Sequence, residues 1–240
     1  RRSSDLADVA FITRVLNASL FANLPYDPVA DFAPVGMTAW GSLVLVANPA
    51  QKPNTLAEFI AAAKAAPKSI NYGSPGIGTP HHLSMALVET QSGIQLVHVP
   101  YRGSAPAGQA FAAGQVELNL SLVTESLNAM KTPGVKPIAM AAAKRAREFP
   151  NVPTFPELGY ENVQVYALNG LMVPAGTPRE IVDRINRDAN AALKTPANRE
   201  RIDKLGLDPV GGTPEDFGEH LQRERERWGP VIRRANIRAE

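Results

Sequence analysis

Short apolar runs of strand length alternate with amphipathic stretches of helix length along most of the chain. The apolar runs cover 42–47, 70–72, 95–99, 116–120, 136–141 and 165–173. Helical patterns follow Thr55 and Thr79, occupy 105–113, and return after Thr177 and Thr213. Strands that alternate with helices of about 10–15 residues indicate βαβ units. The pattern therefore predicts an α/β protein with mostly parallel sheets flanked by helices.

Prolines and a glycine interrupt this alternation at 151–159. The segment reads Asn-Val-Pro-Thr-Phe-Pro-Glu-Leu-Gly, which is typical of an irregular connection between two lobes. The helices predicted after Thr177 and Thr213 would each begin with an N-cap threonine and a proline. In the first of these helices, Ile181 and Val182 belong to an apolar stripe that predicts a buried face.

The composition excludes several classes of protein. The chain has 25 lysines and arginines against 23 aspartates and glutamates, and this net charge of +2 predicts no nucleic-acid partner. The sequence contains no cysteine, which excludes disulfides, thiolate zinc sites and cysteine nucleophiles. No apolar run approaches the roughly 18 residues that span a membrane. A length of 240 residues fits one large domain or two small ones.

The strongest local motif is the glycine-rich segment 73–78, which joins a predicted strand to a predicted helix. The helix would have Thr79 as its N-cap and Pro80 as its first residue. Its unpaired N–H groups attract a carboxylate or phosphate, and the glycines allow the anion to approach closely. A tight turn without a ligand fits the same residues. The glycine spacing matches neither a dinucleotide fingerprint nor a P-loop, so no nucleotide is expected.

Two further turns of small and polar residues follow predicted strands. One contains Tyr101 and Arg102, and the other begins at Ser121. Parallel strands place their carboxyl ends at one edge of a sheet, where ligands of open α/β sheets bind. We therefore expect these two turns to meet the glycine-rich turn at that edge.

The histidines and serines match no catalytic or metal-binding motif. His81 and His82 are consecutive, so they diverge by about 100° around a helix and cannot bind one metal together. We expect both to be solvated or hydrogen-bonded at the helix start, and His98 to be structural. No serine lies in a G-x-S-x-G elbow. We expect no metal, no cofactor and no enzymatic activity; a hydrolase that pairs Ser74 or Ser121 with a histidine is an alternative.

Six groups of residues occur in an order that is itself informative. They are Asn-Leu-Pro-Tyr-Asp-Pro at 23–28 with Asp-Phe-Ala-Pro-Val at 31–35, Val-Pro-Tyr-Arg-Gly at 99–103, Val-Pro-Thr at 152–154 with Glu-Leu-Gly-Tyr at 157–160, Val-Pro-Ala-Gly-Thr-Pro at 173–178, Pro-Val-Gly-Gly-Thr-Pro-Glu at 209–215, and Trp-Gly at 228–229. From about residue 17 to residue 240, the chain resembles the Bug (TctC-like) extracytoplasmic solute-binding receptors of tripartite tricarboxylate transporters.

The resemblance implies a two-lobed periplasmic binding protein that closes on a small carboxylated solute. Residues 1–47 and 166–240 would form the first lobe, and residues 48–165 the second. In this family, backbone amides, small hydroxyls and waters from turns hold the carboxylate. By position, this implies a ligand-binding set of Ser74, Gly78, Thr79, His81, Tyr101 and Ser121. The expected partners are the solute and the membrane permease subunits of a tripartite tricarboxylate transporter, and the receptor is expected to be a monomer.

The sequence departs from the family in two places. Ser121 lies where relatives often have aspartate, which favours a carboxylate without an amino group. Residues 1–15 do not match the strand and Pro-x-Gly-Gly turn of relatives, so we expect the first lobe to lack its N-terminal part. A truncated remnant that binds nothing is therefore a second alternative. The first eight residues contain no apolar segment of a signal peptide, and the periplasmic location is expected from the resemblance alone.

Overall fold

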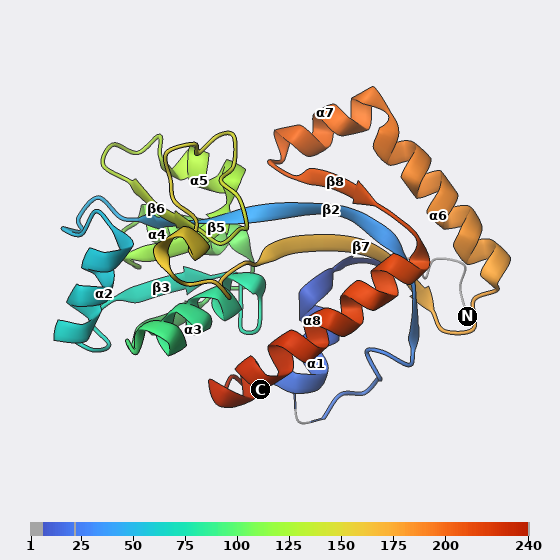
Figure 1. Ribbon diagram of the computed structural model, residues 1–240, viewed down its shortest axis with the longest axis horizontal. Coiled ribbons are helices and arrows are strands. Elements are labelled where there is room, and N and C mark those ends of the chain that lie inside the picture. Colours follow the sequence, from blue (N-terminus) through green and yellow to red (C-terminus); the bar gives the residue numbers. More distant parts are fainter. Residues whose placement is uncertain (1–6, 22, 240) are drawn as a thin grey trace. The chain divides into compact units, whose positions relative to one another are not determined.

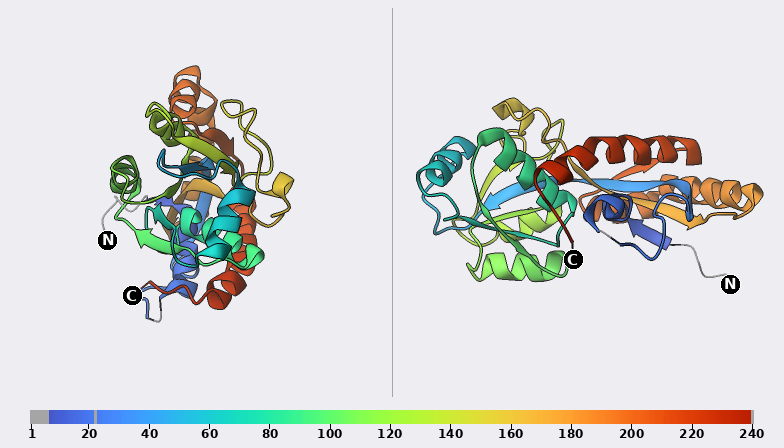
Figure 2. Two further views of the ribbon diagram at one scale, coloured as in Figure 1. Left: turned by 90° about the vertical axis from the view of Figure 1, so that its left-hand side faces the viewer. Right: turned by 90° about the horizontal axis from the view of Figure 1, so that it is seen from below.

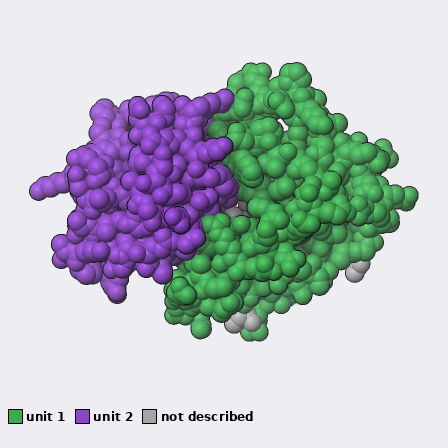
Figure 3. Space-filling view, viewed as in Figure 1, with its two compact units in different colours: residues 1–41, 167–240 green, residues 42–166 purple. Residues whose placement is uncertain are grey.

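The computed structural model describes residues 7–21 and 23–239, and the chain falls into two compact units. Unit 1 contains residues 1–41 and 167–240, and unit 2 contains residues 42–166 (Figure 3). The chain passes between the units inside a strand, because β2 (Phe32–Ala47) continues without a break across residues 41 and 42. The sequence placed the changes of lobe at 47/48 and 165/166, six residues and one residue from these positions.

A mixed sheet forms the centre of unit 2 (Figure 1). Its strands are ordered β6-β2-β5-β3-β4, with β3 (Asn71–Ser74), β4 (Val97–Pro100), β5 (Leu118–Leu122) and β6 (Lys136–Met140). Strand β3 is parallel to β4 and β5, whereas β2 is antiparallel to β5 and β6. The carboxyl ends of β3, β4 and β5 therefore lie at one edge, as the sequence predicted.

Helices follow each of the three parallel strands of unit 2. The helical segments of this unit are α2 (Leu56–Ala65), α3 (Pro80–Ser92), α4 (Ser104–Ala112), α5 (Val123–Ala129) and the 3₁₀ turn η1 (Pro156–Leu158). The predicted N-caps Thr55 and Thr79 are confirmed, because each side chain accepts a hydrogen bond from the backbone N–H three residues later. Gly93 ends α3 with a φ of 66°, a left-handed conformation that favours glycine.

The core of unit 2 joins the middle of the sheet to α4 and to the segment after β6. Val44 and Val46 of β2 belong to the same buried cluster as Phe111 of α4, Met140 of β6 and Phe149. These side chains are almost completely removed from water, and such burial is the main favourable contribution to folding. The face of β5 that points toward this cluster also carries Asn119 and Ser121, because they pair with Val46 and Val44.

Unit 1 contains β1 (Ala7–Ala10), β7 (Tyr166–Pro174) and β8 (Asp208–Gly211) together with the first part of β2. Its helices are α1 (Phe11–Leu20), α6 (Arg179–Lys194), α7 (Pro196–Lys204) and α8 (Pro214–Arg234). The strand order is β1-β7-β2-β8. Helix α1 packs against α8 (Figure 2), and Leu16 and Leu20 of α1 are buried.

The expectation of mostly parallel sheets was wrong for unit 1. The pairs β1–β7 and β2–β8 are antiparallel. The α/β class stands, but the sheets are mixed because β2 is much longer than the apolar run at 42–47 and forms antiparallel pairs in both units, with β8 in one and with β5 and β6 in the other. Strand β8 was missed because it contains a proline and a glycine, which weaken any strand pattern.

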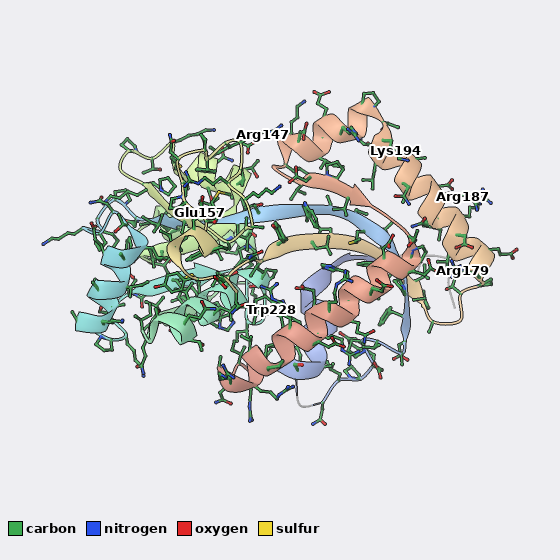
Figure 4. All side chains as sticks on the ribbon, in the orientation of Figure 1. Arg147, Glu157, Arg179, Arg187, Lys194 and Trp228 are labelled. Carbon is green, nitrogen blue, oxygen red and sulfur yellow. The ribbon has the colours of Figure 1, made fainter. Side chains whose placement is uncertain are left out.

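The surface of α6 also differs from the prediction. Val182 is buried, but Ile181 is 44% exposed and does not belong to the core. Arg179 at the start of α6 pairs instead with Glu215 of α8, with 2.7 Å between Nη1 and Oε1 (Figure 4). No helix in the described ranges combines the length and apolarity needed to cross a membrane.

Helix α8 anchors the core of unit 1 through two aromatic residues, Phe217 and Trp228, which are both fully buried. The Trp228 indole N–H donates to Glu224 over 2.7 Å, and Trp228 lies on α8 as Figure 4 shows. The Phe217 ring packs directly on the backbone of β7 at Gly170. A Cβ at Gly170 would lie 2.3 Å from Phe217 Cζ, so this position requires glycine.

We expect Gly170→Ala to lower the free energy of unfolding by about 1–3 kcal/mol, because the added methyl group overpacks a filled core. Gly218→Ala on α8 is the matched control. Its Cβ would meet Pro34 at an ordinary 3.5 Å, and the helix should gain up to about 1 kcal/mol in propensity. Urea unfolding of both variants measures the difference; equal effects would contradict the packing described.

Candidate functional site

The turn between β3 and α3 has the geometry of an anion-binding helix start. Gly76 and Gly78 adopt positive φ values of 152° and 74°, which bring the chain from the strand into the helix. The Thr79 hydroxyl donates to Gly76 O over 2.7 Å and accepts from His82 N at 3.5 Å. The threonine therefore fixes both the turn and the first helical residues.

The buried side chain of Ser74 stabilises the beginning of this turn through hydrogen bonds. The residue is fully buried, and its Oγ lies 2.6 Å from His98 Nε2. The same oxygen accepts from Gly76 N at 3.2 Å and lies 3.1 Å from Gly76 O. The hydroxyl is thus engaged with the protein, so Ser74 acts on the shape of the turn.

Three aromatic rings connect the turn to the sheet. The His98 ring stacks on Tyr72 at 4.9 Å and on His82 at 3.8 Å between ring centroids. The Gly78 N–H donates to His82 Nδ1 over 3.1 Å. A ring nitrogen that accepts a hydrogen bond carries no proton, so this contact requires a neutral His82 with its proton on Nε2. The two ends of the turn are therefore linked through stacked histidines.

His81 is buried at the first turn of α3 and has no hydrogen-bond partner on either ring nitrogen. Burial lowers its pKa to about 4. An unpartnered polar group in the interior costs about 1–3 kcal/mol, and a ligand or a water molecule would remove this cost. The prediction that His81 and His82 are solvated or hydrogen-bonded was therefore wrong for His81 and right for His82, whose Nδ1 accepts a hydrogen bond from Gly78.

Two backbone N–H groups of the turn donate no hydrogen bond within the described residues. Among the hydrogen bonds of the described residues, none uses the backbone N–H of Ile77 or of His81. The other N–H groups nearby are satisfied by Ser74, His82 and Thr79. Free N–H groups at a helix start carry partial positive charge and bind anions.

The structure brings most of the predicted site residues into adjacent turns. Tyr101 N donates to Ser74 O over 2.9 Å, and Gly103 N donates to Pro75 O over 3.0 Å. The turn that contains Tyr101 therefore lies beside the turn that contains Gly78 and Thr79.

The side chain of Ser121 lies on the sheet face opposite Ser74, which is the face that the Tyr101 ring approaches at Gly73. In the register, Gly73 is opposite Asn119, so Asn119 and Ser121 share the face of Gly73, whereas Tyr72 and Ser74 share the opposite face. The Ser121 hydroxyl lies 2.8 Å from the Ser126 hydroxyl of α5. The sequence did not predict this separation because it requires the register of β3 against β5.

The structure gives no support to a hydrolase at Ser74. The pair with His98 exists, but Ser74 is fully buried and a nucleophile must reach its substrate. Burial lowers the pKa of His98 to about 4, far from the value near the working pH that favours a general base. Among the described residues, no group of three or more histidine, aspartate and glutamate side chains is placed to hold a metal ion.

Acid should weaken the fold through these histidines. Burial lowers the pKa of His81, His82 and His98 to about 4, 3 and 4, and the charge of His98 adds to the effect on His82. In the unfolded chain their pKa values are near 6.5, so the unfolded state binds more protons below that pH. The free energy of unfolding is then complete above about pH 6.5 and falls toward pH 4, by up to about 1.4 kcal/mol per pH unit for each histidine.

Urea unfolding of the parent chain and of His81→Gln at pH 7.5, 6 and 5 tests this expectation. The carboxylates titrate in both proteins, so their contribution cancels when the free energy of unfolding of the variant is subtracted from that of the parent at each pH. We expect the free energy of unfolding to fall more in the parent than in the variant over this range. The difference should approach about 1.4 kcal/mol per pH unit, which is the slope for one additional proton bound by the unfolded state. Parallel pH dependences would contradict the assignment to His81.

The turn between β3 and α3 thus presents free N–H groups at a helix start, and the comparisons with known proteins identify the family. The model of the family described as "Tripartite tricarboxylate transporter family receptor" (TctC) matches residues 7–237, so the chain belongs to this family. This is a family of transport receptors, not of enzymes. The resemblance stated from the sequence motifs is confirmed.

Known relatives are about one third identical to the chain over the aligned residues. The UPF0065 protein in the tcbD-tcbE intergenic region of Pseudomonas sp. strain P51 is 32% identical over 219 residues, which are 91% of this chain and 65% of the relative. Protein BugT of Bordetella pertussis is 32% identical over 215 residues, 90% of this chain and 66% of the relative. The chain thus spans about two thirds of the length of these relatives.

Solved structures confirm the periplasmic-binding-protein fold. Rpa4515 of R. palustris, solved with adipate, is 29% identical with a TM-score of 0.87, covering 97% of this chain and 77% of that one. MatC (Rpa3494) of Rhodopseudomonas palustris, solved with malate, is 30% identical with a TM-score of 0.83, covering 95% and 78%. The periplasmic binding protein BugD is 27% identical with a TM-score of 0.85, covering 98% and 78%.

Proposed function

We propose that the chain is a periplasmic receptor that captures a small carboxylate for a tripartite tricarboxylate transporter, and that the turn between β3 and α3 holds the carboxylate. The observation that carries the proposal is the pair of free donors at that turn, the N–H groups of Ile77 and His81. The unpartnered His81 ring adds a third group, since a neutral imidazole donates one hydrogen bond.

The electrostatics of the turn favour an anion. The N-terminus of α3 carries partial positive charge, and the first turn of the helix contains no acidic residue that would compete. Gly76 and Gly78 leave the backbone open, since neither has a side chain between the amides and a ligand. The adipate and malate bound to two structural relatives are small dicarboxylates, which supports this ligand class.

The solute is proposed to lack an amino group. The ligand-binding residues proposed for unit 2 remain Ser74, Gly78, Thr79, His81, Tyr101 and Ser121, with Ser74 acting on the turn's shape rather than on the ligand. A serine at position 121 offers no charge to an ammonium group. Malate should therefore bind more tightly than aspartate, which differs from it by an amine in place of the hydroxyl. The permease subunits of the transporter would receive the solute from this receptor.

Titration calorimetry with malate, succinate and adipate tests the proposal directly, with hexane-1,6-diol as the uncharged counterpart of adipate. At least one of the acids should bind, and the diol should not. Absence of heat with every acid would contradict the proposal and would favour a chain that binds nothing.

Thr79→Ala should weaken the binding of the acid about fivefold, because loss of an N-cap costs about 1 kcal/mol and loosens the helix start. Thr79→Ser is the matched control, since it keeps the hydroxyl that bonds Gly76 and His82. We expect the serine variant to bind as the parent does. Unchanged affinity in the alanine variant would show that the carboxylate binds elsewhere.

A further inference from the structure

A cavity of about 680 Å³ lies in unit 1 along helix α8. Its other walls come from α1, which packs beside α8 (Figure 1), from residues 28–34 and from Met172 of β7. The volume falls within the range of small-molecule sites, which is about 300–1,000 Å³. All the lining residues belong to unit 1, so this cavity is separate from the turn between β3 and α3, which belongs to unit 2.

The two ends of the cavity differ in polarity. One end lies at Gly218, where an added Cβ would stand 3.5 Å from Pro34 Cγ, and Leu221 lines the cavity one turn further along α8. The other end contains Arg233, whose Nη1 lies 3.3 Å from the position of a Cβ added at Gly229. At 1.5 Å per residue, Gly218 and Gly229 are about 16 Å apart along the axis of α8. The lining therefore runs from an apolar end to a cationic end.

The two arginines in the lining are accessible and unpaired. The side chains of Arg225 and Arg233 are exposed, and their guanidinium groups form no ion pair or hydrogen bond with the described residues. By contrast, Arg223 on the same helix lies outside the lining and pairs with Glu219, with 3.6 Å between Nη1 and Oε2. Guanidinium groups without a partner favour a ligand that carries a carboxylate.

Two acidic residues lie at or near the cavity. Glu226 is the one acid in the lining, and its Oε1 accepts a hydrogen bond from Gln222 Nε2 over 3.0 Å. Outside the lining, two backbone hydrogen bonds lower the pKa of Asp27, and the charge of Arg225 adds to this effect. Because Asp27 already interacts with Arg225, Arg233 is the better placed of the two arginines to hold an anion.

We propose that this cavity binds a linear fatty acid of medium chain length. The carboxylate pairs with Arg233 at the cationic end, and the alkyl chain lies along α8 toward Gly218. There the chain covers Leu221 and Val29, which is 46% exposed and lines the cavity. Removing the chain and these side chains from water together is favourable. This site is independent of the carboxylate turn in unit 2.

Decanoate is the probe, and decyltrimethylammonium is its counterpart with the same chain and the opposite charge. Titration calorimetry of the whole chain, below the micelle concentration of each probe, should show that decanoate binds at least about tenfold more tightly than the cation. Saturating malate should leave the affinity for decanoate unchanged, because malate has no alkyl chain and the carboxylate turn lies in the other unit.

Arg233→Gln should weaken the binding of decanoate at least about tenfold, because it removes a hydrogen bond between charged groups. The Arg233 side chain is exposed and unpaired among the described residues, so this variant should fold as the parent does. Arg223→Gln on the same helix is the matched control and should bind decanoate as the parent does. Val29→Asp should weaken binding more than Val29→Asn, since the alkyl chain would remove a charge from water.

Four results would overturn the proposal. They are the absence of decanoate binding, equal binding of decyltrimethylammonium, an unchanged affinity in Arg233→Gln, and loss of decanoate binding in saturating malate. If a variant does not fold, amide shifts in the parent decide: decanoate should move the signals of Gly218, Leu221 and Gly229, and shifts confined to the turn between β3 and α3 would refute the site. A chain that binds decanoate but no malate would contradict only the proposed function, so the two proposals fail separately.

Discussion

The hydrogen bond from the Gly78 N–H to His82 Nδ1 determines the structure of the proposed ligand turn. This hydrogen bond requires that Nδ1 of His82 is unprotonated. The His82 ring stacks on the His98 ring, and Nε2 of His98 lies 2.6 Å from Ser74 Oγ. The first residue of the turn and its last glycine are thus joined through two neutral rings. The turn is held in shape before any ligand arrives, and such preorganisation lowers the entropic cost of binding.

This arrangement also determines which donors remain free. The turn satisfies the N–H groups of Gly76, Gly78 and His82 internally. The N–H groups of Ile77 and His81 are left, together with the imidazole of His81. Protonation of His82 would remove the acceptor for Gly78, so acid acts on stability and on the site through the same contact.

The sequence predicted the local elements of unit 2 well because their signals are local. Thr79 with Pro80 fixes the start of α3, and strands followed by polar turns gave the three carboxyl ends at one edge. The family was recognisable from motifs that lie mainly in turns, where proline and glycine have specific conformational roles.

What the sequence could not predict depends on partners far along the chain. The part of β2 before residue 42 pairs with the short β8, and neither segment carries a strong strand pattern alone. The stacked histidines require the register that places Tyr72 beside His98, and the position of Ser121 on the face opposite Ser74 requires the register of β3 against β5. In the sequence, Tyr72 and Ser74 occupy alternate positions of one predicted strand, and His98 lies on another predicted strand. This pattern was the available signal for the stacked rings, but His98 was assigned only a structural role.

The central claim is that the backbone N–H groups of Ile77 and His81 hold a carboxylate. Nitrogen-15 NMR of the chain titrated with malate or adipate tests it at the level of single amides. The account predicts saturable downfield shifts of the Ile77 and His81 amide protons, as expected for new hydrogen bonds to a carboxylate, with little change at Gly78. An acid that binds while the Ile77 and His81 signals stay in place would contradict it.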